Sequence, residues 1–167
     1  RMVLGLLATL CVVLSGRAAT ESAWPMFRGS PDLAGVSPVS FPDKLKLKWT
    51  YATGDPVRSS AAIVDGRIYV GSDSEEIHAI DAATGKNIWK FKVDGMIESS
   101  PLVLDGIVYC GADDGILYAI NAEDGSEVWR YQTDAQITGA PNWFVRADGT
   151  KAIVIGSHDY FLYGLNA

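Results

Sequence analysis

The chain has 167 residues, of which 48% are hydrophobic, 10% aromatic and 20% charged, and this composition is typical of a folded domain rather than a disordered or fibrous protein. Asp and Glu outnumber Lys and Arg by 20 to 14, which gives a net charge of −6. Because the chain is acidic and has no basic run, it is a poor candidate for binding nucleic acid or an anionic membrane surface.

The first element is an apolar segment, MVLGLLATLCVVL, at Met2 to Leu14. It is too short for a membrane-spanning helix, which needs about 20 residues, but it suits the apolar core of a secretory signal. Gly16 and Ala18 have the small-x-small spacing of a signal peptidase site. We therefore assign residues 1–19 to a signal peptide and expect no transmembrane segment. Sec-type export would take the mature chain to the periplasm, to the outer-membrane face or into the medium.

Cys11 lies within this apolar segment, and two interpretations of it stay open. It is either the lipid-acceptor cysteine of a lipoprotein or an ordinary residue of the apolar core. Leu10 precedes it where a lipoprotein signal has Gly, Ala or Ser, and apolar residues follow it, so we favour the second interpretation. If Cys11 leaves with the signal, only Cys110 remains, and one thiol cannot form an internal disulfide.

Residues 20–43 form a lead-in, which we expect to be extended and able to pack on the domain that follows.

The next segment, Lys46–Tyr51, is predicted to be a strand, and it opens a repeat of about 40 residues that occupies residues 44–167. Trp49, Trp89 and Trp129 are 40 residues apart, and an aromatic residue stands two positions after each of them. Further columns coincide in the three copies: Ser60-Ala61, Ser100-Pro101 and Ala140-Pro141; Asp65-Gly66, Asp105-Gly106 and Asp148-Gly149; Ile68–Gly71, Val108–Gly111 and Ile153–Gly156; Ile77–Asp81, Leu117–Asn121 and Leu162–Asn166.

Each copy is predicted to form four short strands. In the second copy these are Ser99–Leu104, Ile107–Gly111, Ile116–Asn121 and Glu127–Tyr131, and Asp105-Gly106 favours a tight hairpin between the first two. The strands are apolar at successive positions, so both faces of each sheet must be covered. A ring of stacked four-stranded sheets does this, and the sequence therefore predicts an all-β fold, a β-propeller of four-stranded antiparallel blades. The signatures of WD40 blades are missing, and kelch repeats are longer.

The repeat begins with an outermost strand and ends after a third strand, Phe161–Asn166. This phase is typical of a propeller whose last blade is completed by the N-terminal strand. About three blades are present, whereas propellers typically have four to eight. We therefore expect the chain to be the N-terminal part of a longer ring.

The segment Ala79–Trp89 resembles the tryptophan-docking motif of the PQQ-like (quinoprotein-type) β-propeller repeats. The second copy, Ala119–Trp129, keeps the Ala, Gly and Trp but has Asn121 where the motif favours Asp. The resemblance implies a ring of seven or eight blades, with each indole wedged between neighbouring blades against small residues. The residues to which it gives this structural docking role are Trp49, Ala79, Gly85, Trp89, Ala119, Gly125 and Trp129.

The resemblance also limits the activities that can be expected of this chain. The family includes enzymes, outer-membrane assembly factors and non-catalytic propellers. Its quinoprotein dehydrogenases use a vicinal Cys-Cys disulfide, an acidic catalytic residue with calcium, and a stacking Trp. This chain has no adjacent cysteines, so we expect a non-catalytic scaffold that binds a protein partner or small ligand, with no catalytic residue and no cofactor. The alternative is the N-terminal fragment of a PQQ-dependent alcohol or sugar dehydrogenase, and only this alternative brings PQQ and calcium.

Candidate contact residues stand just before the innermost strands, where a propeller opens its central channel. At this position the three copies have Arg58, Glu98 and Thr138, which are 40 residues apart. These residues differ in chemistry, whereas the repeated positions around them are constant. They are either solvated loop residues or the rim that faces a partner.

The spacing between the two histidines and the carboxylates does not indicate a metal site. His78 occupies the column of Tyr118 and Tyr163, so we expect it to fill an aromatic position in a strand. His158 falls in the turn column of Asp113. The carboxylates near Asp73 and Asp113 could serve calcium, which prefers oxygen ligands, but the chemistry of turns already explains them. We predict no metal site.

Overall fold

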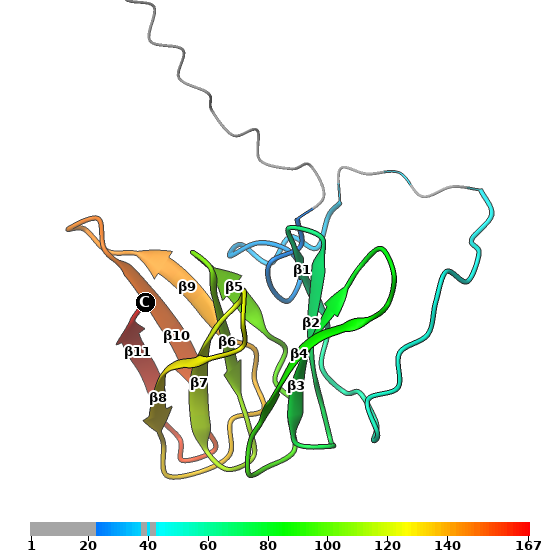
Figure 1. Ribbon diagram of the computed structural model, residues 1–167. Helices are drawn as coiled ribbons and strands as arrows, with labels where there is room; N and C mark the ends of the chain where they lie inside the picture. The colour runs from blue at the N-terminus through cyan, green and yellow to red at the C-terminus, as the bar shows by residue number, and fades with distance from the viewer. Residues whose placement is uncertain (1–22, 38–39, 41–42) are drawn as a thin grey trace, which may run out of the picture.

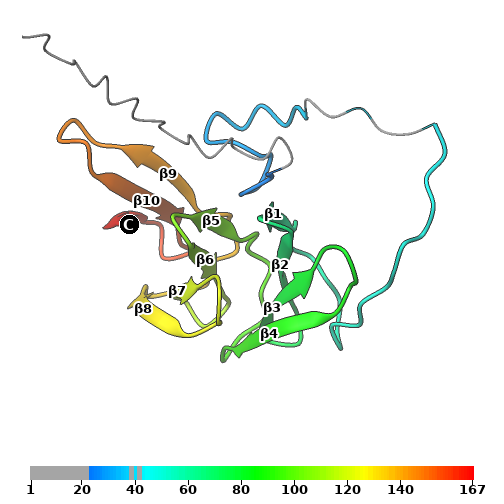
Figure 2. The ribbon, with the colours of Figure 1, turned by 45° about the horizontal axis from the view of Figure 1, so that its top comes forward.

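The computed structural model describes residues 23–37, 40 and 43–167. Within these residues the chain forms eleven strands in three antiparallel sheets, and no helix that could cross a membrane is found there. The sheets stand side by side, each in contact with the next (Figures 1 and 2). The predicted signal peptide, its cleavage site and Cys11 lie outside the described residues.

Each sheet is one blade, and its strands follow chain order from the innermost strand outward. The first blade contains β1 (Ala62–Val64), β2 (Arg67–Ser72), β3 (Glu76–Asp81) and β4 (Asn87–Lys92). The second contains β5 (Leu102–Leu104), β6 (Ile107–Gly111), β7 (Ile116–Asn121) and β8 (Glu127–Gln132). The third contains β9 (Asn142–Val145), β10 (Lys151–Gly156) and β11 (Leu162–Asn166). The predicted all-β propeller architecture is confirmed.

The inner strand of the second blade is shorter than predicted, because β5 begins at Leu102 rather than at Ser99. The two serines before it make other bonds. Ser99 Oγ donates to Gly139 O at 2.8 Å, and Ser60 N donates to Ser100 Oγ at 2.8 Å. Both bonds reach a neighbouring blade, so these residues tie blades together instead of extending the strand.

In the first two blades the Asp-Gly dipeptides between the inner strands make tight hairpins, as the sequence predicts for Asp105-Gly106. Asp105 and Gly106 have φ angles of 51° and 80°, and Asp65 and Gly66 have 49° and 73°. Two consecutive residues with positive φ are the signature of the type I′ turn, which matches the twist of the strands it joins. The turns therefore fix the register of β1 with β2 and of β5 with β6.

The predicted outer strand Lys46–Tyr51 is wrong: this segment forms no strand in the structure. An outermost strand needs the third strand of its own blade beside it, as β4 has β3. No described strand lies in that position next to Lys46–Tyr51. Its side chains nevertheless contact the first blade, because Trp49 Nε1 donates to Ala82 O at 3.1 Å.

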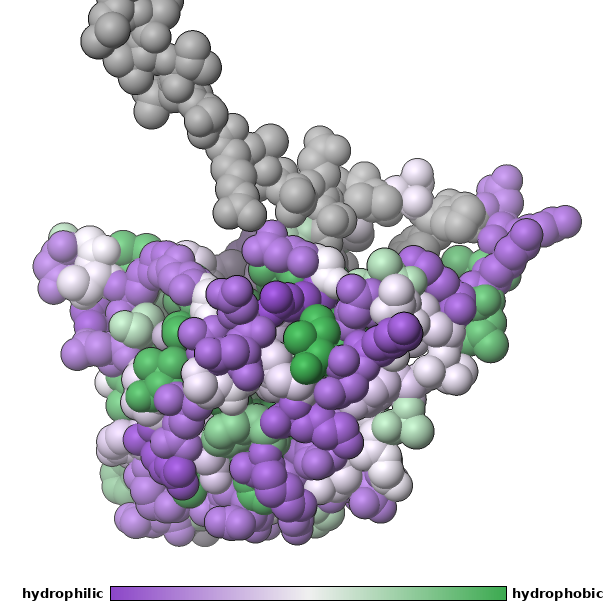
Figure 3. Space-filling model, in the orientation of Figure 1, coloured by the Kyte–Doolittle hydropathy of each residue, from purple (hydrophilic) through white to green (hydrophobic). Residues whose placement is uncertain are grey.

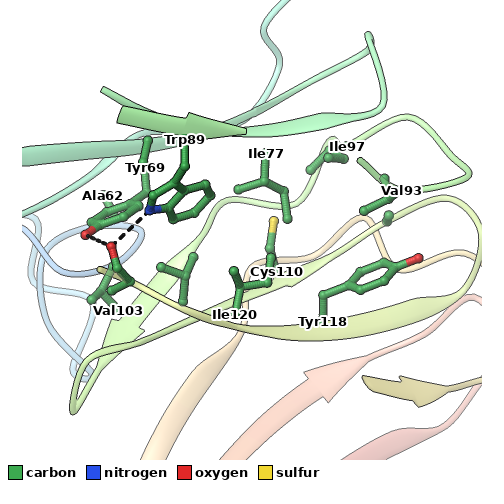
Figure 4. Packing of buried hydrophobic residues seen from close by; sticks show 14 residues of the cluster. Ala62, Tyr69, Ile77, Trp89, Val93, Ile97, Val103, Cys110, Tyr118 and Ile120 are labelled. Carbon is green, nitrogen blue, oxygen red and sulfur yellow. Dashed lines mark hydrogen bonds between the residues drawn. The ribbon is translucent and has the colours of Figure 1, made fainter. Parts of the chain in front are cut away.

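Apolar side chains fill the spaces between blades, as expected for strands that are apolar on both faces. Between the first and second blades, Tyr69, Ile77 and Trp89 face Cys110 and Ile120 in one buried cluster (Figure 4). A second cluster lies between the second and third blades. The outer surface is mostly hydrophilic on the face seen in Figure 3, with apolar residues in separate patches.

The lead-in packs along the free edges of the inner strands. Trp24 exchanges two backbone hydrogen bonds of 2.7 Å with Ile63 in β1, and Val103 in β5 donates to Pro25 O at 2.7 Å. Met26 is 1% exposed and belongs to the second buried cluster. Residues 26–32 fold into tight turns rather than the expected extended backbone, because Gly29 N turns back to donate to Met26 O at 2.9 Å.

Candidate functional site

The three predicted contact positions occupy equivalent places before the inner strands. In each blade a backbone N–H of the turn between the second and third strands donates to a backbone carbonyl of the segment that leads into the inner strand. This segment carries the contact residue. The donors are Asp73 N, Asp113 N and His158 N, and the acceptors are Pro56 O, Met96 O and Gln136 O, each at 2.9 Å. The repeat thus sets Arg58 beside Asp73, Glu98 beside Asp113, and Thr138 beside His158. We call these six residues the polar rim.

In the first blade the rim pair is an ion pair. Arg58 Nε lies 3.2 Å from Asp73 Oδ2, and Arg58 Nη1 donates to Glu98 Oε1 of the next blade. The hydrogen bond to Glu98, followed by the charge of Asp73, raises the pKa of Arg58 above its ordinary value. One guanidinium therefore bridges the rims of two blades.

In the second blade the rim pair consists of two carboxylates. Asp113 Oδ1 is buried and has no hydrogen-bond partner among the described residues. Burial raises the pKa of Asp113, and the neighbouring Glu98 and Asp73 raise it further, while His158 and Arg58 act in the opposite direction. The second pair therefore holds like charges together at the position where the first blade has an attractive pair.

In the third blade the rim pair is joined by a hydrogen bond, with Thr138 Oγ1 at 3.0 Å from His158 Nε2. The structure thus brings Arg58 and Glu98 into contact and gives Thr138 the same place one blade further on. Sequence reasoning assigned Asp73, Asp113 and His158 to turns and missed their pairing with the contact column. The signal was available, since Asp73 and Asp113 repeat the spacing of 40.

The residues assigned to docking lie between blades, away from the rim. Trp89 is 8% exposed, and its Nε1 donates to Ala122 O of the next blade at 3.1 Å. Tyr69 Oη donates to the same carbonyl oxygen (Figure 4). Gly125 lies under the same indole, because a Cβ added there would be 2.7 Å from Trp89 Cδ2.

The neighbouring copies repeat this arrangement in part. Trp49 lies on Gly85, whose added Cβ would be 2.5 Å from Trp49 Cδ2. Within the blades, Ala79 is directly opposite Trp89, and the same register sets Ala119 opposite Trp129. Trp129 is only half-buried, and no described residue supplies a glycine of this kind beside it. The carbonyls of Ala82 and Ala122 were not predicted, because a backbone acceptor leaves no mark in the sequence.

His78 is 0% exposed in β3 and fills the aromatic column. Its ring lies edge-on to Tyr51, with a centroid distance of 5.5 Å, as Tyr118 lies against Phe91 one blade further on. Tyr51 Oη is 3.2 Å from His78 Nδ1, and Ser72 Oγ is 3.3 Å from Nε2. Burial lowers the pKa of His78, and Lys90 lowers it further, against an opposing effect of Glu76.

Acidification is expected to destabilise the fold through His78. Because the pKa is lower in the folded state, the unfolded state takes up a proton first. Stability should therefore fall as the pH drops below about 6.5, the ordinary pKa of histidine, towards the lower pKa of the folded state. Urea unfolding across pH 5 to 8 measures this, with His78→Tyr, which matches the other two blades, as the control. Equal slopes in the two proteins would contradict the assignment.

No group of three or more His, Cys, Asp or Glu side chains arranged for a metal ion occurs in the described part of the chain. Cys110 is a free, buried cysteine, and burial raises the pKa of its thiol to about 12, so that it stays neutral.

Comparisons with known proteins agree with this architecture. The family model described as outer membrane protein assembly factor BamB matches residues 39–166. No curated protein sequence matches the chain.

Among solved structures, the fold is similar to quinohemoprotein alcohol dehydrogenase from Comamonas testosteroni, with 28% identity and a TM-score of 0.69 over 87% of this chain and 25% of the enzyme. It is similar to BamB from Moraxella catarrhalis, with 24% identity and a TM-score of 0.60 over 71% of this chain and 36% of BamB. Quinohemoprotein alcohol dehydrogenase ADHIIG from Pseudomonas putida HK5 gives 23% identity and a TM-score of 0.67 over 88% of this chain and 25% of the enzyme. The chain thus spans a quarter to about a third of the length of these proteins. It belongs to the family of BamB-like PQQ β-propeller repeats.

Proposed function

We propose that the chain is part of a non-catalytic propeller that binds a protein partner or a small ligand through the polar rim. The observation that carries this proposal is a contrast between two parts of the repeat: the docking of the indoles is the same from blade to blade, whereas the pairs of the polar rim differ. Trp49 and Trp89 dock in the same way on successive blades. The rim pairs at equivalent places are an ion pair, a carboxylate pair and a hydroxyl–imidazole pair. A surface that varies on a constant scaffold is typical of a contact surface.

The apolar segment and small residues of 1–19 support export to the periplasm, the outer-membrane face or the medium. The family match over residues 39–166 supports a role in outer-membrane protein assembly for the protein to which this chain belongs. Under this proposal the lead-in and the docked indoles hold the blades, and the rim supplies the contacts.

Site-specific cross-linking tests the contact surface in exported, full-length protein. A photoreactive residue at Thr138 should give a discrete adduct in intact cells, whereas the same residue at Glu123, an exposed turn position, should not. Matching yields at the two positions would show that the rim is not a specific contact surface.

The second candidate is a piece of a quinoprotein alcohol dehydrogenase, which the 28% identity with the Comamonas enzyme favours. The two candidates differ in a direct measurement, absorbance titration of the full-length protein with PQQ and calcium. The binding proposal predicts no saturable change in the PQQ spectrum. Saturable binding of one PQQ per chain would replace the proposal with the dehydrogenase.

A further inference from the structure

We propose that residues 23–35 of the lead-in are a strap that holds the first and second blades closed over a cleft. Release of this strap lets the two blades open before the rest of the fold unfolds. The inference goes beyond the contact surface, because the cleft lies at the opposite end of the blades from the polar rim. The inner strands β1 and β5 run from the rim to the turns Asp65-Gly66 and Asp105-Gly106, and both turns border the cleft.

The cleft has a volume of about 790 Å³ and lies between the first two blades. Val64 and Tyr69 line it from the first blade, Val103 lines it from the second, and Ala23 and Pro25 of the strap form a further wall. Across an open space of this size the two blades make no packing contact, so they gain no dispersion energy there. At this end the blades must therefore be held together at the borders of the cleft.

The border near the outer strands is held by one backbone carbonyl of the second blade, Ala122 O. Three donors of the first blade meet at this oxygen: Trp89 Nε1 and Tyr69 Oη at 3.1 Å, and Arg67 Nη1 at 2.8 Å. These bonds belong to the blades themselves, so they remain whether the strap is in place or not.

The border near the inner strands is held by the strap, which lies beside β1 and β5 (Figures 1 and 2). Trp24 exchanges two backbone hydrogen bonds with Ile63 of the first blade, and Pro25 O accepts from Val103 N of the second, each at 2.7 Å. Trp24 and Pro25 are consecutive residues. The two inner strands are therefore joined through neighbouring peptide groups of a segment that belongs to neither blade.

The strap continues to the third blade. Met26 is 1% exposed in the second buried cluster, which also contains Leu102 of the second blade and Ile155 of the third. Asn142 Nδ2 of the third blade donates to Pro31 O at 3.2 Å. The strap thus crosses three successive blades, and Met26 anchors it beside the two residues that close the cleft.

The backbone of the strap is wound against its own preference. Arg28 and Leu33 have φ angles of 59° and 55°, a left-handed conformation that is unfavourable for residues other than glycine. Gly29 has φ 84° and lies on the ring of Trp24, where an added Cβ would be 2.9 Å from Cε3. The contacts of the strap, and not its backbone preference, keep it folded. Such a segment opens locally at a lower free-energy cost than a blade.

Gly29→Ala in the full chain tests the strap, because the added methyl group would push the ring of Trp24 away. Gly149→Ala is the matched control: Gly149 has φ +83°, and an added Cβ there meets nothing within 4 Å. The readout is the rate at which a thiol reagent modifies Cys110, located by mass spectrometry. This thiol is 0% exposed between the first two blades (Figure 4), so labelling requires that they open.

We expect Cys110 to be labelled at least about tenfold faster in Gly29→Ala than in Gly149→Ala, the size expected when one or two hydrogen bonds that close the gap are lost. Hydrogen exchange at the amides of Ile63 and Val103 should accelerate in the same variant. Met26→Ala should also speed the labelling, and more than Ile155→Ala does, which truncates the same buried cluster outside the strap. This second pair decides the matter if Gly29→Ala does not fold.

Urea unfolding of each variant gives the acceleration that global unfolding alone would produce. An increase in labelling no larger than this factor overturns the inference, since the whole fold then opens at once. Faster exchange at Ile63 and Val103 with unchanged labelling of Cys110 also overturns it, because the strap then detaches while the blades stay closed. The adduct at Thr138 tests the rim at the other end of the blades, so either inference can fail without the other.

Discussion

Replacing Trp89 by alanine is expected to lower the free energy of unfolding by about 3–5 kcal/mol, the usual cost of truncating a buried aromatic residue. The indole is 8% exposed, packs at 5.8 Å from the ring of Tyr69, and donates to Ala122 O across the gap between two blades. The truncation removes apolar contact and also removes one of the donors to that carbonyl. Urea unfolding followed by circular dichroism gives the loss.

Trp129 provides the matched control, because it occupies the same column of the second blade. Its side chain is only half-buried, and no described glycine or carbonyl receives it. Trp129→Ala should therefore cost clearly less than Trp89→Ala in this chain. Losses of the same size would mean that the indole contributes through its own sheet and not through contact with the next blade.

Gly125→Ala is expected to cost about 2–4 kcal/mol, from a left-handed backbone and from overpacking. The φ angle of Gly125 is +76°, and its added Cβ would lie 2.7 Å from Trp89 Cδ2, closer than any ordinary contact. The substitution would therefore lift the indole off the blade that holds it. The same unfolding measurement applies.

Gly106→Ala separates the two causes. Gly106 has φ +80°, but an added Cβ there meets nothing within 4 Å, so only the backbone cost remains. Combining Gly125→Ala with Trp89→Ala completes a double-mutant cycle. The steric part of the glycine substitution should vanish when the indole is absent. A fully additive double variant would refute direct contact as the cause.

The fold could be predicted from the sequence because the repeat fixes strand order and turn chemistry together. The columns of Trp49, Trp89 and Trp129 set the period, and Asp65-Gly66 and Asp105-Gly106 set the first hairpins of the first two blades. The strand predicted at Lys46–Tyr51 failed for a physical reason. A strand is defined by its neighbour, and the pattern of a single segment cannot show whether that neighbour is beside it.

The candidate site could be predicted only in part. The column of Arg58, Glu98 and Thr138 is visible in the sequence, since its chemistry varies while the frame is constant. Its pairing with Asp73, Asp113 and His158 depends on which turn folds back onto which connection, and five extra residues in the third copy hide the match. The burial of Met26 was also unforeseen, because nothing in an irregular segment shows which surface it will meet.

The position of the lead-in has a consequence for self-association. The innermost strand of a blade has one edge without a ladder partner, and such edges recruit strands from other molecules. Trp24 occupies both backbone groups of Ile63, and Pro25 takes the amide of Val103. By covering these groups the lead-in takes up hydrogen-bonding positions on the inner edges of the first two blades that a strand of another molecule would otherwise use for β-pairing.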